Sequence, residues 1–422
     1  MADADTWDKA KLMGTGEEGK GADMVKDNPM LWGVPGYLTE EDADTYFKFK
    51  EDVNSRDAEL RKTVYSFGEV EGEVWCLTRW LRARKFDLPE TIKMIEEATE
   101  CHKVPRENDY YSDPAKALGC DVALYFANYP QLYTGKSKIG APIFISKPGV
   151  LNTDAIECIT TLDGILKFHW WVEMHEFGNL LRNEKEKNDD FKLFQCFSIL
   201  DLEGLTTSQL TSRALAIIKE QAAVDSLCFP ETMSRMFIIN SPLFFSASWR
   251  LIKGWLDPRT ASKIDVVSSK DAAKKKLLEL IDEDQLPVDY GGTGPDTKET
   301  LRSEIKGDAI KIHSEMMYLR GSGSFSIEVS QGEYVEVEVW TRSTAGGGFS
   351  VVDHNDKKNI IVDKMEVKHE GTGDEKESPT RVVMTKTRLA GPMHLRVKAE
   401  SNAGRFSCHN YLLAFIFFDK PN

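Results

Sequence analysis

The stretch that decides the fold is FPETMSRMFIINSPLFFSASWRLIKGWLDPRTASKI, residues 229–264. Within it, the apolar run 236–239 predicts a buried strand, which the Asn240-Ser241-Pro242 turn ends. Residues 242–256 then form a predicted apolar helix with aromatic side chains almost all round it. Such a helix must be buried on several sides or meet lipid. The strand, the helix and the polar residues that follow them therefore suggest a pocket with an apolar lid and a charged rim.

Around this stretch the chain alternates between strand-like and helical segments. Strands separated by helices are typical of βαβ units. Residues 113–295 are therefore predicted to form an α/β domain with a mainly parallel sheet. The predicted strands are residues 143–145, 193–202, 236–239 and 264–267, and the predicted helices are residues 154–182, 206–227, 242–256 and 270–284.

The flanking segments differ in composition and predict separate units. Residues 1–34 are polar, acidic and glycine-rich, and they are expected to be disordered. Residues 35–112 predict a helical N-terminal subdomain, with a capping-box-like start at Thr39-Glu40-Glu41-Asp42. The polar residues 296–311 predict a linker. Residues 312–422 have an apolar period of two, which predicts a small all-β sandwich.

The bulk composition narrows the classes of function. The 422 residues allow two or three domains, and 41% hydrophobic with 29% charged residues is ordinary for a globular protein. A net charge of -14 argues against nucleic acid as the main partner, because binding phosphates requires a basic face. Seven scattered cysteines without a C-x-x-C pattern indicate reduced thiols and a cytoplasmic protein. The apolar runs are far shorter than the roughly 20 residues that span a bilayer, so membrane contact is expected to be peripheral.

Catalytic and metal-binding patterns give no candidate site. The chain has neither G-x-S-x-G nor H-E-x-x-H, and it is not expected to be an enzyme. His169 and His175 lie with Glu173 and Glu176 on one predicted helix, but the histidines are six residues apart and face different sides. Because a metal site needs convergent ligands, no metal and no cofactor are expected, and these side chains are assigned a structural or pocket-lining role.

Four segments resemble the CRAL-TRIO lipid-transfer family, of the yeast phosphatidylinositol/phosphatidylcholine transfer protein type. They keep the order and spacing of that family between residues 77 and 293. The predicted C-terminal sandwich is similar to a GOLD domain, and the combination resembles the patellin and supernatant protein factor group. The matching segments are LTRWLRARKFD (77–87), ILDLEGL (199–205), the stretch 229–264 and LPVDYGGT (286–293).

The resemblance implies a phosphoinositide head-group site. Glu231 would accept hydrogen bonds from inositol hydroxyls, and Thr260 and Lys263 would hold the phosphodiester. Arg84 and Lys85 would add positive charge. A phosphate that leaves water needs such charge-assisted donors, which are stronger than neutral ones.

The resemblance also implies an apolar cavity that is floored by the sheet and closed by a movable gate helix, residues 242–256. Ser198 and Cys196 occupy the strand positions at which the family binds a choline head group through hydroxyls. Cys196 replaces one of those hydroxyls, which leaves open a different phospholipid or a neutral isoprenoid as the second ligand. The gate side chains would be Phe244, Phe245, Trp249, Ile252 and Trp255.

Two functions of different classes follow from the resemblance. The first is binding and transfer of phosphatidylinositol, or another phospholipid, between membranes by a cytoplasmic, peripherally membrane-associated protein. The second is a phosphoinositide-sensing adaptor in membrane traffic that binds a protein partner through the GOLD domain. Neither function requires a cofactor.

Overall fold

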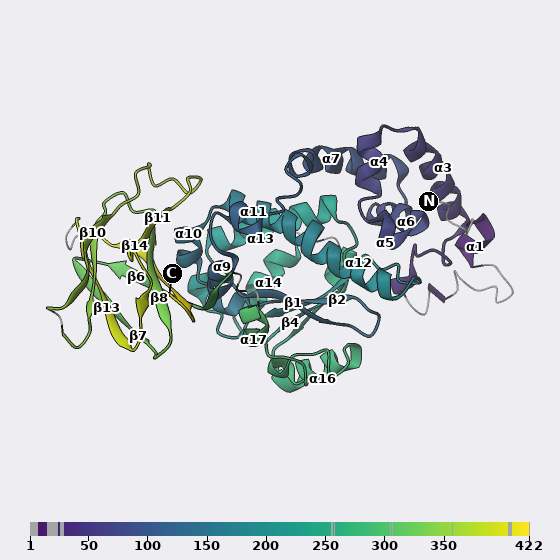
Figure 1. The fold of residues 1–422 in the computed structure, drawn as a ribbon. Coiled ribbons are helices and arrows are strands. Elements are labelled where there is room, and N and C mark those ends of the chain that lie inside the picture. The colour runs from purple at the N-terminus through teal and green to yellow at the C-terminus, as the bar shows by residue number, and fades with distance from the viewer. Residues whose placement is uncertain are drawn as a thin grey trace.

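A computed structural model describes residues 7–14, 24–25, 29–254, 256, 258–303, 305, 307–356, 358–403 and 407–421. These residues form three units in a row: helices at the N-terminal end, an α/β unit in the middle and a β-sandwich at the C-terminal end (Figure 1). The order of the elements confirms the predicted fold class.

The helical unit is built around amphipathic helices that share one core. α3 (Glu40–Ser55) starts at the predicted capping box, where the Asp42 N–H donates to the Thr39 hydroxyl at 3.1 Å. α6 (Glu73–Ala83) places Trp80 in the core with no exposed surface. The remaining helices are α4 (Ala58–Val64), α5 (Gly68–Glu71) and α7 (Leu88–Glu107).

The N-terminal segment is ordered in part. Residues 7–14 include α1 (Lys9–Met13), and Leu12 is fully buried in the core of the helical unit. The expectation of disorder is therefore wrong for residues 7–14, and also for residues 29–34, which include the 3-10 helix η1 (Pro29–Leu31) and Trp32, whose ring packs edge-on against Phe86. A single leucine within a polar segment gives no periodic signal, although its burial contributes about 1.5–3 kcal/mol.

The middle unit contains a five-stranded sheet in the order β1-β2-β3-β4-β5. β2 to β5 are parallel, as predicted, whereas β1 pairs antiparallel with β2 at the edge. The sequence patterns missed β1 because only one of its six side chains is fully buried. The strands are β1 (Gln131–Lys136), β2 (Pro142–Ser146), β3 (Cys196–Asp201), β4 (Met233–Ile239) and β5 (Ile264–Val267).

The two faces of this sheet are covered to different extents. α16 (Lys270–Leu280) packs on one face, where Phe197 and Phe237 are 2% exposed. Figure 1 shows α11, α12 and α13 on the opposite side of the sheet from α16. On that side, Met236 and Ile264 stay only partly buried near α14 (Phe245–Lys253). One apolar face is therefore closed and the other is incompletely covered.

The long helix predicted for residues 154–182 is interrupted. The Thr160 hydroxyl donates to the Leu118 carbonyl at 2.5 Å, and the Thr161 hydroxyl accepts from the Gly164 N–H at 2.9 Å, so one helix ends and another is capped there. Apolar periodicity continues through this break, which explains why the sequence predicts a single helix. The segments are α10 (Thr153–Ile159), α11 (Leu162–Trp171), the π-helical η3 (Val172–Phe177) and α12 (Gly178–Lys187).

The C-terminal unit is the predicted all-β sandwich, and its strands pair antiparallel. One sheet has the order β10-β9-β13-β7 and the other β11-β8-β14-β6, with β12 also paired to β8. Apolar side chains of both sheets form one core between them. The strands are β6 (Ala309–Leu319), β7 (Ser322–Val329), β8 (Tyr334–Thr341), β9 (Gly347–Asp353), β10 (Ile360–Val367), β11 (Thr380–Val383), β12 (Leu389–Ala390), β13 (Met393–Ser401) and β14 (His409–Phe418).

The sandwich is docked onto the α/β unit. Trp340 and Leu412 share a buried cluster with Ile156 of α10. Arg342 donates from Nε to a backbone carbonyl of α10 at 2.6 Å and from Nη2 to the next loop at 2.7 Å. The segment predicted as a linker contains α17 (Thr297–Ser303), whose first residue is fully buried. It is therefore a folded part of the connection.

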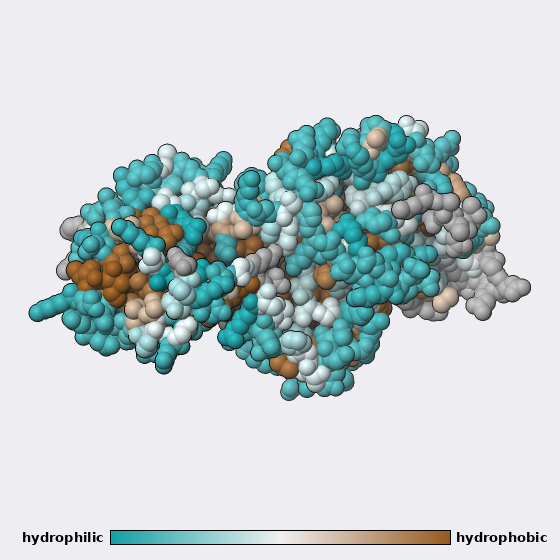
Figure 2. All heavy atoms as spheres, in the orientation of Figure 1, coloured by the Kyte–Doolittle hydropathy of each residue, from teal (hydrophilic) through white to brown (hydrophobic). Residues whose placement is uncertain are grey.

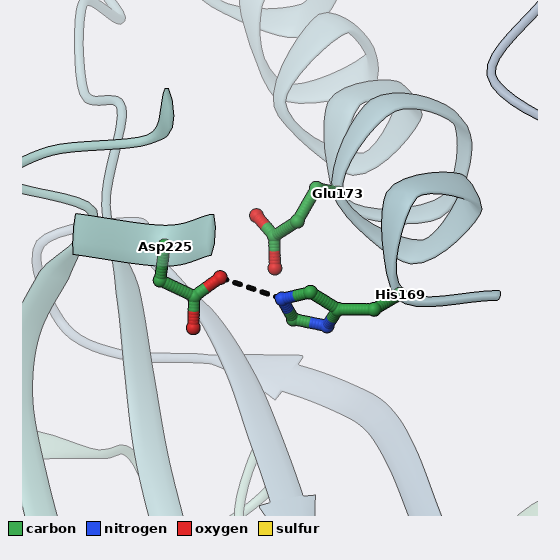
Figure 3. Close-up of side chains that lie close together, drawn as sticks. All are labelled: His169, Glu173 and Asp225. Atoms are coloured by element: carbon green, nitrogen blue, oxygen red, sulfur yellow. Dashed lines mark hydrogen bonds and ion pairs between the residues drawn. The ribbon is translucent and has the colours of Figure 1, made fainter. Parts of the chain in front are cut away.

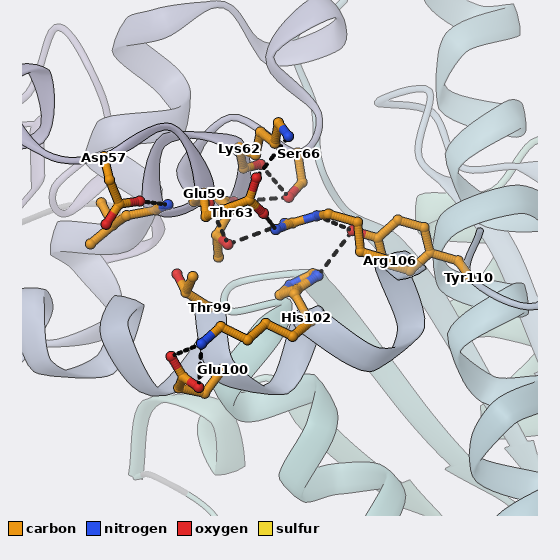
Figure 4. Close-up of polar contacts among 12 residues, drawn as sticks. Asp57, Glu59, Lys62, Thr63, Ser66, Thr99, Glu100, His102, Arg106 and Tyr110 are labelled. Atoms are coloured by element: carbon orange, nitrogen blue, oxygen red, sulfur yellow. Dashed lines mark hydrogen bonds and ion pairs between the residues drawn. The ribbon is translucent and has the colours of Figure 1, made fainter. Parts of the chain in front are cut away.

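The helical unit meets the α/β unit at the end of α7. Arg106 contacts Glu59 at 2.7 Å, and its Nε donates to the Tyr110 hydroxyl at 3.3 Å (Figure 4). His102 lies one turn earlier with no exposed surface, and its ring packs edge-on against Trp170 at 4.9 Å. Burial lowers the pKa of His102 to about 3.

Because the pKa of His102 is lower in the folded than in the unfolded state, acid is expected to destabilise the protein. Near pH 7 both states hold the ring neutral. Below about pH 6.5 the His102 ring binds a proton in the unfolded state but not in the folded state. Between that pH and the pKa of the folded state, the free energy of unfolding therefore falls by up to about 1.4 kcal/mol per pH unit. Urea unfolding of the wild type and His102→Gln between pH 7 and pH 4.5 measures this effect. A stability difference that does not change with pH would contradict it.

Candidate functional site

Glu231 is the centre of a buried ionic cluster. It lies in the turn between α13 (Ser212–Cys228) and β4, with a left-handed backbone (φ 67°). Its carboxylate lies 3.3 Å from Lys263 Nζ and 3.6 Å from Arg82 Nη2, and it accepts a hydrogen bond from Arg259 Nη2. The side chains of Glu231 and Lys263 are only 8% and 5% exposed. Residues from the first helical unit and from the region around β4 and β5 therefore meet at one carboxylate.

This cluster joins three cations to one carboxylate. Burial alone would raise the pKa of Glu231, but Lys263, Arg82 and Arg259 lower it below its ordinary value. Burial lowers the pKa of Lys263 and of Arg82. The buried Nε of Arg82 has no hydrogen-bond partner among the described residues. Buried donors and excess positive charge of this kind are suited to binding an anion.

Thr260 belongs to the same neighbourhood. It lies on α15 (Pro258–Ser262), is half-buried, and its carbonyl accepts the Lys263 N–H at 3.0 Å. Arg84 and Lys85 lie in the turn after α6. Arg84 donates to the adjacent backbone carbonyl at 3.1 Å, and Lys85 is exposed. In the described part of the chain, neither is joined to Glu231 by a hydrogen bond or an ion pair, and their role in the site stays a prediction.

Arg82 and Arg259 are the cluster members that sequence reasoning missed. Both lie inside the matching segments, but neither was selected. Arg259 donates to the Arg82 carbonyl at 2.9 Å, and its guanidinium lies 5.0 Å from the centre of the Trp32 ring. Arg79, one turn before Arg82, donates to the Pro230 carbonyl at 3.4 Å. The three-residue spacing places Arg79 and Arg82 on one face of α6, but it does not show what that face contacts.

Ser198 lies on β3, on the incompletely covered face of the sheet. It is 5% exposed, and its hydroxyl is 3.6 Å from the Cys196 sulfur. Burial raises the pKa of Cys196 to about 12, so its thiol stays protonated. A thiol is a weaker hydrogen-bond donor than the hydroxyl it replaces. The Cys196 N–H donates to the Thr232 carbonyl at 2.7 Å, which connects this strand to the turn that carries Glu231.

The predicted gate helix is present as α14, which spans residues 245–253 rather than 242–256. Phe245 is 5% exposed, and Trp249 and Ile252 are half-buried against the incompletely covered sheet face. Trp255, also predicted for the gate, lies outside the described residues.

The outward side of this region is also apolar. Leu243 is 94% exposed, Leu251 53% and Phe244 36%. Arg250 and Lys253 supply positive charge beside them. An exposed apolar surface next to basic side chains is typical of a segment that touches a membrane surface. Among the described residues, no helix combines the length and apolar character needed to cross a bilayer.

Comparison with known families and proteins identifies relatives of this chain. The CRAL/TRIO domain model matches residues 127–292, and the model of the CRAL/TRIO N-terminal domain matches residues 45–97. The SEC14 cytosolic factor of Eremothecium gossypii is 32% identical over 263 residues, which cover 62% of this chain and 80% of that protein. The SEC14 cytosolic factor of Kluyveromyces lactis is 31% identical over 263 residues, 62% and 81% of the two chains.

A plant relative is similar over a smaller share of its length. The phosphatidylinositol/phosphatidylcholine transfer protein SFH12 of Arabidopsis thaliana is 32% identical over 259 residues, 58% of this chain and 45% of that protein. The two matched domains correspond to the α/β unit and to part of the helical unit that supplies Arg82. The chain belongs to the CRAL/TRIO family.

Proposed function

We propose that this protein binds phosphatidylinositol and transfers it between membranes. The observation that carries the proposal is the ionic cluster at Glu231, which lies next to the sheet whose apolar face under α14 is incompletely covered. An anion receptor beside partly exposed apolar side chains suits a ligand with a phosphate at one end and hydrocarbon at the other. Of the three relatives described above, two are named SEC14 cytosolic factor, and one is named for transfer of phosphatidylinositol and phosphatidylcholine.

The cluster offers donors for the phosphate of this head group and an acceptor for its inositol hydroxyls. Lys263 and Arg259 would donate to the phosphodiester, and Glu231 would accept from inositol hydroxyls. A phosphate would offset the excess positive charge that one carboxylate leaves. The acyl chains would lie against the partly covered face with Met236 and Ile264, where each buried CH₂ contributes about 0.8 kcal/mol.

Transfer also requires an opening step at the membrane. α14 is the element expected to move, because Phe245, Trp249 and Ile252 pack on the apolar face and leave it only partly covered. Leu243 and Leu251 would enter the lipid surface and stabilise the open form. The protein would then act from the cytoplasm as a peripheral membrane protein, without a cofactor.

A second proposal concerns the sandwich, which we propose to be a GOLD domain. Figure 2 shows a mainly hydrophilic surface on which prominent hydrophobic patches lie over the sandwich, around β10 and β13. Ile360 of β10 is 57% exposed. An apolar patch on a folded unit favours a protein or membrane partner. In this adaptor function the lipid would be sensed and not released.

Replacing Lys263 with alanine is expected to reduce phosphatidylinositol transfer by about 10- to 100-fold, because a hydrogen bond to a charged group contributes about 1.5–3 kcal/mol. Transfer of fluorescent phosphatidylinositol between vesicles is the measurement. Lys270→Ala is the matched control, since Lys270 is 69% exposed and pairs with Glu203 on the surface. Wild-type transfer by a folded Glu231→Ala, Lys263→Ala double variant would refute the assigned head-group site.

Native mass spectrometry of the purified protein separates the possible functions. Bound phosphatidylinositol together with transfer activity supports the first proposal. Bound phosphatidylinositol without transfer supports the adaptor. A neutral isoprenoid as the sole bound lipid would overturn both and identify a hydrophobic carrier.

A further inference from the structure

His169, Glu173 and Asp225 form a cluster away from the Glu231 site. His169 is on α11, Glu173 on η3 and Asp225 on α13, and one ligand atom from each lies within 4.8 Å of the other two. His169 Nε2 is 2.6 Å from Asp225 Oδ1. Figure 3 shows the Glu173 carboxylate pointing toward the other two side chains. Three potential ligands from three segments therefore converge.

Glu173 is the member that the protein's own contacts do not explain. It is 8% exposed, and its buried Oε2 has no hydrogen-bond partner among the described residues. Burial, together with the nearby Asp225 carboxylate, raises the pKa of Glu173 to about 8. His169 and Asp225 are hydrogen-bonded to each other, but this bond gives no partner to the buried Oε2 of Glu173. A buried polar atom without a partner is uncommon and indicates a missing ligand.

The three groups match the requirements of a metal ion. Residues four apart on a helix face the same side, so His169 and Glu173 converge, and Asp225 reaches them from the neighbouring helix. Imidazole nitrogen with carboxylate oxygen is a ligand set for first-row divalent metals such as zinc. Burial lowers the pKa of His169, but the Asp225 carboxylate raises it to about 9, so a bound cation would displace the imidazole proton, and the two carboxylates would then balance the charge of the cation.

The sequence analysis did not identify this cluster because it considered His169 together with His175, which faces a different side of the helix. His175 is half-exposed, and its Nε2 contacts the Asp109 carbonyl at 2.8 Å. The third ligand, Asp225, comes from a different helix. Glu173 lies in the π-helical turn η3, and such turns are frequent at functional sites.

We propose that His169, Glu173 and Asp225 bind one first-row divalent cation, with zinc as the best match to the ligand set. An alkylammonium head group is a poorer fit, because three polar atoms within 4.8 Å hold an ion more readily than a bulky substituted nitrogen. The Asp225 side chain is 46% exposed, which provides a path for the ion. The bound ion would fasten α13 to α11 and η3 above the sheet face that carries Cys196 and Ser198.

Zinc binding to the full chain tests the proposal directly. After removal of metals by chelation, wild-type protein is expected to bind one zinc ion, measured by elemental analysis and by native mass spectrometry with zinc added alone. Glu173→Gln and Asp225→Asn are each expected to weaken binding by more than about tenfold, since loss of even an outer-sphere partner costs 10- to 100-fold. Cobalt in place of zinc should give a spectrum without the strong absorption of a thiolate ligand.

Two controls separate this site from adventitious binding. His175→Gln changes a histidine on the same helical segment and should keep the bound zinc. Cys101→Ser combined with Cys408→Ser removes the two exposed thiols and should also keep it. Loss of the zinc from the cysteine variant, or an unchanged zinc content in Glu173→Gln, would overturn the proposal.

Thermal stability gives an independent readout. Metal-free Glu173→Gln should be at least as stable as the wild type, because it removes a buried carboxylate that lacks a hydrogen bond at one oxygen. Zinc should raise the melting temperature of the wild type and leave that of Glu173→Gln unchanged. An equal rise in both proteins, or no zinc bound by the wild type, would contradict the assigned ligands.

Discussion

Glu231→Gln is expected to lower the free energy of unfolding by about 3–5 kcal/mol, the cost of breaking a buried ion pair on one side. Glutamine keeps the size of the side chain, so no cavity contributes. What changes is charge: Lys263, Arg82 and Arg259 would face one another without the carboxylate that lowers their repulsion. Urea unfolding at neutral pH, followed by circular dichroism, measures the loss.

The control for this prediction is Glu203→Gln. Glu203 also pairs with a lysine, Lys270 at 2.5 Å, but both side chains are more than half exposed. Exposed pairs contribute about 0–1 kcal/mol, so this variant should remain close to the wild type. Phosphatidylinositol vesicles or inorganic phosphate should restore part of the stability of Glu231→Gln by supplying an anion. If Glu231→Gln and Glu203→Gln lost equal free energies of unfolding, the buried Glu231 cluster would contribute no more than an exposed ion pair.

Leu243→Glu combined with Leu251→Glu is expected to reduce binding to anionic vesicles by about 100-fold or more. Burying one leucine contributes about 1.5–3 kcal/mol, and the two side chains together would lose about twice that amount. Because Leu243 is 94% exposed and Leu251 is 53% exposed, folding should be little affected. Vesicle sedimentation measures binding, and the thermal midpoint reports the fold.

Val104→Glu is the matched control for the leucine variant. Val104 is an apolar residue on α7 with 58% exposure, but it is remote in sequence from α14. Its substitution should leave vesicle binding unchanged. If the leucine double variant binds vesicles like the wild type, the membrane-facing side of the protein lies elsewhere.

Much of the fold follows from local patterns in the sequence. The strands β4 and β5 are apolar runs bounded by turn residues, and the period of two after residue 312 predicts the sandwich. The boundaries of the helices between residues 153 and 187 were less accessible. Thr160 ends α10 by donating to Leu118, a residue that lies far back in the chain. A contact of this kind leaves no trace in a local window.

In the candidate sites, too, some residues can be identified from the sequence, and others depend on contacts between distant segments. Glu231, Thr260 and Lys263 were identified through a resemblance. The structure joins Glu231 and Lys263 by an ion pair, and the role of the three residues in binding lipid stays a prediction. Arg82 and Arg259 could not be singled out, since their proximity depends on how α6 packs against the turn before β4. Asp225 is a clearer case, because its partner His169 lies on another helix and nothing in its own neighbourhood predicts the contact.

The way the sandwich is attached determines where the protein can be divided. Trp340 and Leu412 cover Ile156 and its buried neighbours in the α/β unit. A fragment that stops before the sandwich would uncover this apolar surface and leave the carbonyls bound by Arg342 without their donor. Such a fragment would be prone to self-association. A shortened lipid-binding fragment therefore needs polar substitutions on the apolar surface of α10. In the full chain, the sandwich covers this surface.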